Sequence, residues 1–293
     1  MAEPTFGDRL AAAVARTGPI CAGIDPSPAL LAAWGLPDDA GGLRSFAATC
    51  VDAFAGVAPV VKPQVAFFER HGAAGLAVLE HLVADARSAG LLVIADAKRG
   101  DVDSTVAAYA DAWLGPTSPL AADAVTAVAY LGVGALDPLF ALARQTGRGV
   151  IVVARSSNPE GRPLQEALLR APMSAGAAGD QSVEDGLLAA LAEMNRVELA
   201  GRPESTVGSV GAVVGATLDP SGFPLERLRG PVLAPGVGAQ GGTPERVAAL
   251  FGGCPAGTVV PNVSRSVLAA GPSVAALREA AVATREQLAA ALG

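Results

Sequence analysis

The chain has 293 residues, of which 51% are hydrophobic and 17% are charged, and its formal net charge at pH 7 is −7. This composition predicts a folded globular protein with a large core and excludes a disordered chain. The acidic balance argues against a general nucleic-acid binder, so an anionic ligand would need a local pocket of positive charge.

The N-terminus, the cysteines and the histidines bear on where the chain works. The first eighteen residues carry acidic groups and no apolar core, unlike a secretory leader, and no apolar run has the length of a membrane span. Three cysteines, Cys21, Cys50 and Cys254, form no CxxC pair, which argues against a disulfide framework. The two histidines, His71 and His81, lie in helical surroundings without zinc-like spacing. We therefore expect a cytoplasmic protein with free thiols, no metal, no membrane and no nucleic-acid partner.

Eight short apolar runs recur along the chain, rich in valine and isoleucine and without polar alternation. Such runs are typical of parallel strands that are buried on both faces. They lie at residues 19–25, 58–64, 90–98, 123–130, 149–157, 208–217, 231–238 and 257–264.

Helix-like stretches separate these runs. The stretches at 43–57, 74–90 and 135–147 end at or near glycine, which commonly stops a helix. Thr243 and Pro244 offer an N-cap and a first helical residue for a later helix, and a long helix closes the chain.

Eight β/α repeats in this length predict a (β/α)₈ TIM barrel, an α/β fold with a parallel eight-stranded barrel, as a single domain over residues 1–293. An open, doubly wound sheet is the alternative, because it gives the same alternation. No GxGxxG follows the first run and no GxxxxGK[ST] occurs anywhere, which weakens the nucleotide-binding versions of that alternative.

Residues 158–207 form an insertion between the fifth and sixth predicted strands. Two helical pieces flank a small, polar stretch at 174–182, which we expect to be mobile. The insertion could cover the mouth of the barrel or could be a surface excursion, and the sequence favours neither.

Polar residues follow six of the eight predicted strands, at the end where TIM barrels hold their catalytic groups. One polar strand end is more often a satisfied structural group than a catalytic one, but six on the same rim favour a site. These ends carry Asp25, Lys62, Asp96 with Lys98, Ser156 to Asn158, the glycine-rich stretch 235–242, and Ser264 to Ser266.

The third strand carries the densest group of charges. Asp96 and Lys98 are two residues apart, so both side chains point to one face of the strand. Lys62 on the adjacent strand can reach them if that face is the barrel interior, and Asp101 lies in the loop that follows. Acids and bases that alternate in one pocket compensate each other, whereas a single buried charge is costly.

A second group of residues fits a phosphate. The stretch 235–242 is rich in glycine and precedes a helix, so its backbone N–H groups can face an anion. Gln240 adds a side-chain donor, and Arg265 after the eighth strand can bind phosphate with two hydrogen bonds. The loops after strands seven and eight are where TIM barrels commonly hold phosphate.

Taken together, these segments resemble orotidine 5′-phosphate decarboxylase, and most closely its longer bacterial branch. The stretch DAKRGDVDST matches the Asp-x-Lys-x-x-Asp motif of that family. Three further segments match in order and extend the resemblance over nearly the whole chain. They are VVKPQVAFFE (60–69), ARSSNPEG (154–161) and APGVGAQGG (234–242).

The resemblance implies a decarboxylation of orotidine 5′-phosphate to uridine 5′-phosphate without a cofactor, in which a lysine stabilises and protonates a C6 carbanion. Lys62, Asp96, Lys98 and Asp101 match the catalytic charge network of the family. Asp101 and Thr105 match residues that reach into the active site of a neighbouring subunit, so the resemblance implies a homodimer with shared sites.

It also implies the substrate contacts. Asp25 and Lys62 match ribose contacts, and Ser157 matches the contact to the pyrimidine edge, with Ser156 beside it as the other possible register. The positions that pack on the ring or hold the phosphate are matched by Pro235, Gln240 and Arg265.

The chain departs from the family pattern at two places. Val128 and Ala129 stand where Asn-Pro is common, and Ser264 stands where glycine usually precedes the arginine. Two other functions stay open. Sugar-phosphate enzymes of the hexulose-phosphate type share the Asp-x-Lys-x-x-Asp spacing but use a divalent metal, and a non-catalytic phosphate-binding barrel would be a different class.

Overall fold

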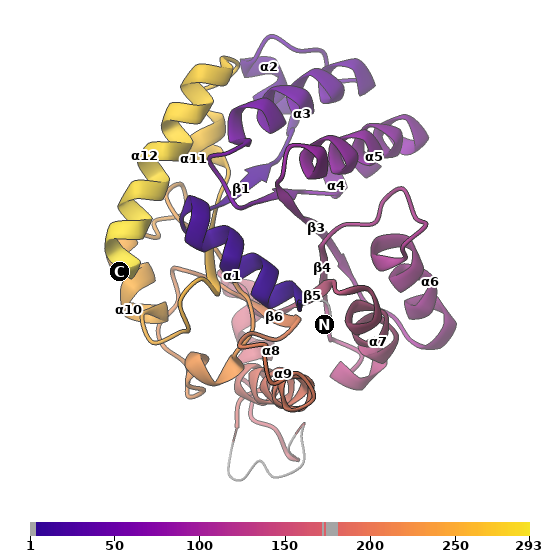
Figure 1. Ribbon diagram of the computed structural model, residues 1–293, viewed down its shortest axis with the longest axis vertical. Helices are drawn as coiled ribbons and strands as arrows, with labels where there is room; N and C mark the ends of the chain where they lie inside the picture. The colour runs from indigo at the N-terminus through magenta and orange to yellow at the C-terminus, as the bar shows by residue number, and fades with distance from the viewer. Residues whose placement is uncertain (1–3, 172, 174–180) are drawn as a thin grey trace.

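Eight parallel strands alternate with helices and close into a barrel in the computed structural model, which describes residues 4–171, 173 and 181–293 (Figure 1). The strands follow one another around the barrel in sequence order, and β8 pairs back with β1 through Cys21 and Asn262. The predicted TIM barrel is therefore confirmed, and the open sheet is excluded because both of its edges are paired. The strands are β1 (Cys21–Ile24), β2 (Val60–Pro63), β3 (Leu92–Arg99), β4 (Ala124–Ala127), β5 (Gly149–Arg155), β6 (Val210–Val214), β7 (Val232–Pro235) and β8 (Val259–Val263).

Helices surround the strands and cover their outer faces with a continuous apolar core. Several begin at a side-chain cap, among them the predicted one, where the Thr243 hydroxyl accepts from the backbone N–H of Arg246. The helices are α1 (Phe6–Thr17), α2 (Pro28–Ala33), α3 (Ala40–Phe54), α4 (Ala66–Glu69), α5 (Gly72–Ser88), α6 (Asp103–Leu114), α7 (Asp137–Thr146), α8 (Arg162–Gln165), α9 (Val183–Ala200), α10 (Pro244–Phe251), α11 (Arg265–Leu268) and α12 (Val274–Leu292), with short 3₁₀ turns η1 (Val133–Leu136), η2 (Pro159–Gly161) and η3 (Leu225–Leu228).

Helix α1, which the sequence analysis did not predict, closes the N-terminal end of the barrel and lies in front of the strands in Figure 1. Its Phe6, Leu10 and Val14 pack against one inward-facing apolar residue from every strand. Because this end is filled, a ligand site inside the barrel has to open at the opposite end. The apolar ring consists of Cys21, Val60, Ile94, Ala124, Ile151, Val213, Leu233 and Val260.

The inward-facing position two residues further along each strand is of a different character. Side chains two apart on a strand share a face, so these positions lie directly above the apolar ring, toward the C-terminal ends of the strands. Half of them carry a polar side chain. They are Gly23, Lys62, Asp96, Thr126, Val153, Gly215, Pro235 and Asn262.

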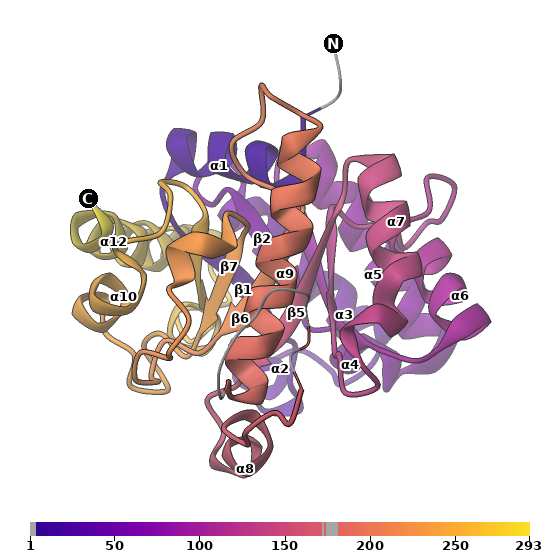
Figure 2. The same ribbon diagram turned by 90° about the horizontal axis from the view of Figure 1, so that it is seen from below.

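The region between β5 and β6 contributes α8 and α9. Helix α9 packs against β5 and β6, so it belongs to the outer layer of the barrel. Its Asn195 bonds to both backbone groups of Val210, and its buried Glu184 forms an ion pair with Arg155 at the end of β5 (2.8 Å). Helix α8 lies at the end of the molecule opposite α1 (Figure 2). Most of the stretch expected to be mobile, residues 174–180, lies outside the described residues.

Two findings concern membranes and metals. No helix within the described residues combines the length and apolar character that a membrane span needs. The same residues contain no cluster of three or more histidine, cysteine, aspartate or glutamate side chains that could hold a metal ion.

Candidate active site

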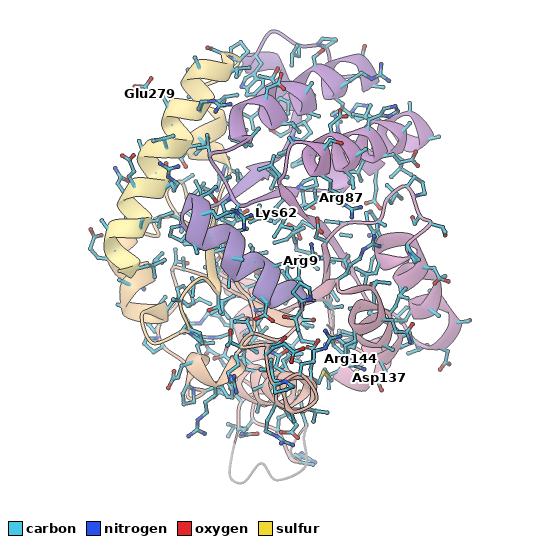
Figure 3. The ribbon with its side chains drawn as sticks, in the orientation of Figure 1. Arg9, Lys62, Arg87, Asp137, Arg144 and Glu279 are labelled. Atoms are coloured by element: carbon cyan, nitrogen blue, oxygen red, sulfur yellow. The ribbon has the colours of Figure 1, made fainter. Side chains whose placement is uncertain are left out.

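Asp96 stands at the centre of the polar positions and binds both lysines that the sequence predicted. The Lys62 ammonium lies 2.9 Å from Oδ2, and the Lys98 ammonium lies 2.5 Å from Oδ1. The side chains of Lys62 and Asp96 are 6% and 9% exposed, whereas that of Lys98 is 47% exposed. Lys98 is therefore the more accessible of the two ammonium groups, and Lys62, which is labelled in Figure 3, is almost fully enclosed.

Lys62 and Lys98 are also the only two lysines in the sequence. The other nineteen basic side chains are arginines. Arginine keeps its proton at any ordinary pH, whereas a lysine can give one up. The chain therefore keeps lysine only at the one place where two ammonium groups meet a carboxylate.

Two neutral donors complete the surroundings of Asp96. Gln64 Nε2 donates to Oδ2 and Thr126 Oγ1 donates to Oδ1, each at 2.9 Å. Each oxygen of the carboxylate thus accepts one bond from an ammonium group and one from an uncharged group. The sequence analysis singled out neither Gln64 nor Thr126.

The charges of this cluster support one another. Burial alone would raise the pKa of Asp96, but the two ammonium groups and their hydrogen bonds outweigh it and hold the pKa well below its usual range. Burial alone would lower the pKa of Lys62, but the carboxylates of Asp96 and Asp25 raise it above its ordinary value. Asp96 is therefore an anion and Lys62 a cation throughout the physiological pH range.

Lys98 reaches Asp96 from an irregular backbone. Its φ is +48°, in the left-handed region that is costly for a residue with a side chain, and the pairing of β3 with β4 shifts register between Ala95 and Arg99. The backbone N–H of Lys98 donates to Thr126 Oγ1 (2.9 Å) instead of to the strand ladder. The predicted proximity of Asp96 and Lys98 is confirmed, but a bulge rather than a regular strand produces it.

Asp101 does not join this cluster within the chain. Its carboxylate accepts from the backbone N–H of Val102 (2.8 Å), and in the described part of the chain it forms no ion pair with Lys62 or Lys98. Thr105 is exposed in the first turn of α6. The structure thus brings together three of the four predicted charges, and it leaves Asp101 on a loop at the surface.

Buried oxygen atoms without a partner identify the next part of the site. Oδ1 of Asp25, just after β1, and Oδ1 of Asn262 on β8 are both buried, and neither has a hydrogen-bond partner among the described residues. A buried acceptor that lacks a donor is costly, so both atoms are suited to accept from a bound molecule. Asn262 was not predicted, although its place two residues after inward-facing Val260 could have indicated it.

The loop after β7 reaches toward the end of β5. Ser157 Oγ donates to Gln240 Oε1 (3.4 Å). Ser156 instead forms two bonds with Gln165 of α8, through its backbone N–H (3.1 Å) and its hydroxyl (2.7 Å). Ser157 is therefore the serine whose side chain is turned to the loop, which favours the register that places it at the ligand.

Part of the expectation for the glycine-rich loop needs correction. The N–H groups of Gly238, Gly241 and Gly242 bond to carbonyl groups of the loop itself, so they are not free to bind an anion. The side chains of Gln240 and Arg265 are exposed and remain candidates for that role. Arg265 is the first residue of α11, and in the described part of the chain its side chain forms no hydrogen bond or ion pair.

Comparison with known proteins agrees with this geometry. A profile of the Orotidine 5′-phosphate decarboxylase / HUMPS family matches residues 18–280. The chain belongs to this family. Curated relatives named orotidine 5′-phosphate decarboxylase are 52% identical over 278 residues in Salinispora arenicola and 49% identical over 277 residues in Corynebacterium efficiens, and both alignments cover 94% of each protein. The crystal structure of a proposed orotidine 5′-phosphate decarboxylase from Streptomyces avermitilis superposes with a TM-score of 0.90 at 49% identity and covers 100% of this chain and 97% of that one.

The departure from the family pattern at Ser264 is accommodated by a glycine. A Cβ on Gly23 would lie 1.8 Å from Ser264 Oγ, so β1 can pass this serine only because residue 23 has no side chain. Ser264 Oγ in turn accepts from Asn262 Nδ2 (3.5 Å).

Proposed function

We propose that this chain converts orotidine 5′-phosphate into uridine 5′-phosphate and CO₂, the last step in the de novo synthesis of uridine 5′-phosphate, and that it needs no cofactor. The observation that carries the proposal is the carboxylate of Asp96 between the only two lysines of the chain, at the open end of a TIM barrel. Relatives of the same length that are about half identical carry the name of this activity.

Lys98 is the proposed proton donor. When the bond between C6 and the carboxyl carbon breaks, CO₂ leaves and the electron pair stays on C6. The nearby ammonium group stabilises this negative charge and then transfers one proton from Nζ to C6, which leaves a neutral amine that solvent reprotonates. Its half-exposed position is compatible with both steps, and an arginine could not perform the second.

Asp96 and Lys62 prepare this step. The ionised Asp96 faces the carboxylate that leaves, so its charge favours departure of CO₂ and holds the Lys98 ammonium in place. Lys62, enclosed beneath, keeps Asp96 ionised and is also placed to meet a ribose hydroxyl.

The rest of the rim binds the nucleotide. In this proposal Asp25 accepts from the ribose, Ser157 meets the pyrimidine edge and Pro235 packs on the ring. Gln240 and Arg265 hold the phosphate, and this remote binding energy is expressed in the transition state. Support comes from two groups that have no polar partner among the described residues: one buried oxygen of Asp25 and the guanidinium group of Arg265.

The functional unit is proposed to be a cytoplasmic homodimer with shared active sites. The loops after β3 and β4 are joined where the Val128 N–H donates to the Arg99 carbonyl (2.9 Å). These loops expose Val102, Tyr130 and Leu131, of which Tyr130 is 75% exposed. An apolar surface beside Asp101 and Thr105 fits a partner subunit that receives both residues.

Mixing an inactive Asp101→Asn dimer with an inactive Lys98→Ala dimer should restore part of the activity, because one hybrid site would then be intact. Demonstrated subunit exchange without any recovery would contradict shared sites.

The reaction itself is tested by following the loss of orotate absorbance with orotidine 5′-phosphate in the presence and absence of EDTA. Turnover that EDTA leaves unchanged is the expected result. Turnover that EDTA abolishes would favour a metal-dependent sugar-phosphate enzyme of the same superfamily. Binding of the nucleotide without release of CO₂ would favour a non-catalytic phosphate-binding barrel.

A further inference from the structure

We infer that Thr126 and Gln64 are positioning residues of the decarboxylation: they hold the Asp96 carboxylate in a fixed orientation while Lys98 gives up its proton. The inference rests on the proposed function, and it assigns a role to two side chains that lie outside the charge network. Each forms a 2.9 Å hydrogen bond to a different oxygen of Asp96.

The direction of the Thr126 hydroxyl is determined by its two neighbours. The backbone N–H of Lys98 can only donate and the carboxylate of Asp96 can only accept, so the single O–H of Thr126 has to point at Asp96 Oδ1. Thr126 is fully buried on β4, where water cannot replace it. Thr126 thus connects the backbone N–H of Lys98 to Asp96 Oδ1, the same oxygen that the Lys98 ammonium group binds.

The need for Thr126 is greatest during proton transfer. Before it, Oδ1 is bound by an ammonium group and a hydroxyl. After Lys98 has released its proton, the bond from Nζ to Oδ1 loses its charge, and the Thr126 hydroxyl is the one donor at Oδ1 whose strength is unchanged. Without it, the carboxylate could rotate away from the reacting carbon.

Gln64 holds the other oxygen from a well-anchored backbone. It pairs with Asp96 as an isolated bridge, and its N–H donates to the Ile24 carbonyl (3.2 Å). At Oδ2, however, Lys62 stays charged throughout the reaction. We therefore expect the loss of Gln64 to matter less than the loss of Thr126.

The test compares Thr126→Val, Thr126→Ser and Gln64→Met with the unchanged enzyme. Valine keeps the shape of threonine and removes the hydroxyl. The matched control is Thr258→Val, because Thr258 is equally buried but donates to the Pro255 carbonyl near the opposite end of the barrel. The assay is turnover of orotidine 5′-phosphate as a function of pH. Circular dichroism checks that each variant folds, and the ¹³C NMR signal of the Asp96 carboxyl carbon reports its titration.

Thr126→Val should lower kcat by roughly 10- to 100-fold, the effect of losing a hydrogen bond to a charged group, with little change in KM. Thr126→Ser should recover most of the rate, Gln64→Met should lose less, and Thr258→Val should keep the kcat of the unchanged enzyme. The loss of this donor should also raise the pKa of Asp96, which the ¹³C NMR titration of its carboxyl carbon measures.

An unchanged kcat in Thr126→Val would overturn the inference, and so would a serine variant as slow as the valine variant. Failure of the unchanged enzyme to consume orotidine 5′-phosphate would instead contradict the proposed function. The NMR titration of Asp96 would still decide whether Thr126 holds the carboxylate: an unmoved titration in Thr126→Val overturns that role.

Discussion

The two ends of the barrel use the same residue types for opposite purposes. At the N-terminal end, Asp123 is 3% exposed and fully satisfied, with one oxygen on Arg9 (2.8 Å) and the other on the Val93 N–H (3.0 Å). Arg9 also donates to the Gly147 carbonyl. At the C-terminal end, Asp25 has a buried oxygen without a hydrogen-bond partner among the described residues. Among the same residues, the Arg265 side chain has no hydrogen bond or ion pair.

The difference shows how stability and function are separated within a few residues of one strand. Asp123 immediately precedes β4, and Thr126 lies three residues further along the chain. Asp123 binds Arg9 of α1 at the closed end, whereas Thr126 contacts the proposed catalytic carboxylate of Asp96. Substitutions at the closed end should therefore change the free energy of unfolding and leave the rate unchanged, whereas substitutions at the open end should change the rate, whether or not they also change stability.

The largest expected effect is that of Lys98→Ala. Removal of the more exposed of the two ammonium groups should lower kcat by about a thousandfold or more, because it removes both charge stabilisation and the proton donor. The fold should be retained, since the side chain is half exposed. Absorbance of the orotate ring measures turnover and thermal unfolding measures stability. Near-normal turnover by this variant would remove Lys98 from the mechanism.

Lys62→Met tests whether the enclosed lysine is needed for the fold as well as the reaction. It leaves the buried Asp96 with one cation fewer, and loss of one partner of a buried ion pair costs about 3–5 kcal/mol. Urea unfolding should show this loss, and Lys98→Met is the matched control, with a much smaller effect. Equal destabilisation by the two variants would contradict the difference in burial.

The pH dependence of this stabilisation follows from the directions of the two pKa shifts. Asp96 has a folded pKa below its unfolded value, so its contribution is present above about pH 4 and is lost as pH falls through the folded pKa. Lys62 has a raised pKa, so its contribution is present below about pH 10.4 and is lost as pH rises through the folded pKa. The stability difference between the unchanged chain and Lys62→Met should stay constant between these limits.

Arg265→Ala should have a smaller effect that appears in kcat/KM. A charge-assisted contact to phosphate is lost, so kcat/KM should fall by roughly 10- to 100-fold. The melting temperature should not change, because the side chain is exposed and forms no hydrogen bond or ion pair in the described part of the chain. Arg278→Ala, an exposed arginine on α12 that bonds to the Asp52 carbonyl, is a suitable control. An unchanged kcat/KM would remove Arg265 from the phosphate site.

Arg9→Ala, at the closed end, should give the smallest change. It deprives the buried Asp123 of its charged partner and should lower the free energy of unfolding by about 1–3 kcal/mol. Turnover per folded enzyme should stay the same. A fall in kcat would mean that the two ends of the barrel are coupled, and the separation proposed above would not hold.

Sequence patterns predicted the strands well because parallel strands covered on both faces need continuous apolar runs. Each of the eight predicted runs overlaps one strand, and each strand is shorter than its run. Helix α1 was missed, although Phe6, Leu10 and Val14 repeat every four residues, a spacing that indicates one buried helix face.

Around the central carboxylate, the residue pattern predicted only the side chains that carry charge. Asp96, Lys62 and Lys98 stand out because charges are unusual at the end of an apolar strand. Thr126 lies within an apolar run and has no charge, so the sequence does not mark it. Its role follows from the fold, which places its hydroxyl on β4 next to Asp96 on β3. The left-handed backbone of Lys98 is also a result of the tertiary fold, because no local pattern demands it.

Helix α1 has a consequence for the order in which the molecule assembles. Its contacts reach the far end of the sequence: Thr5 donates to the Val207 carbonyl, and Leu10 belongs to a cluster that includes Val260 on β8. Contacts this distant along a chain form slowly, because a long loop has to close before they are made. Helix α1 therefore completes its packing only once β8 is in place, and the apolar face that seals the barrel stays exposed until then.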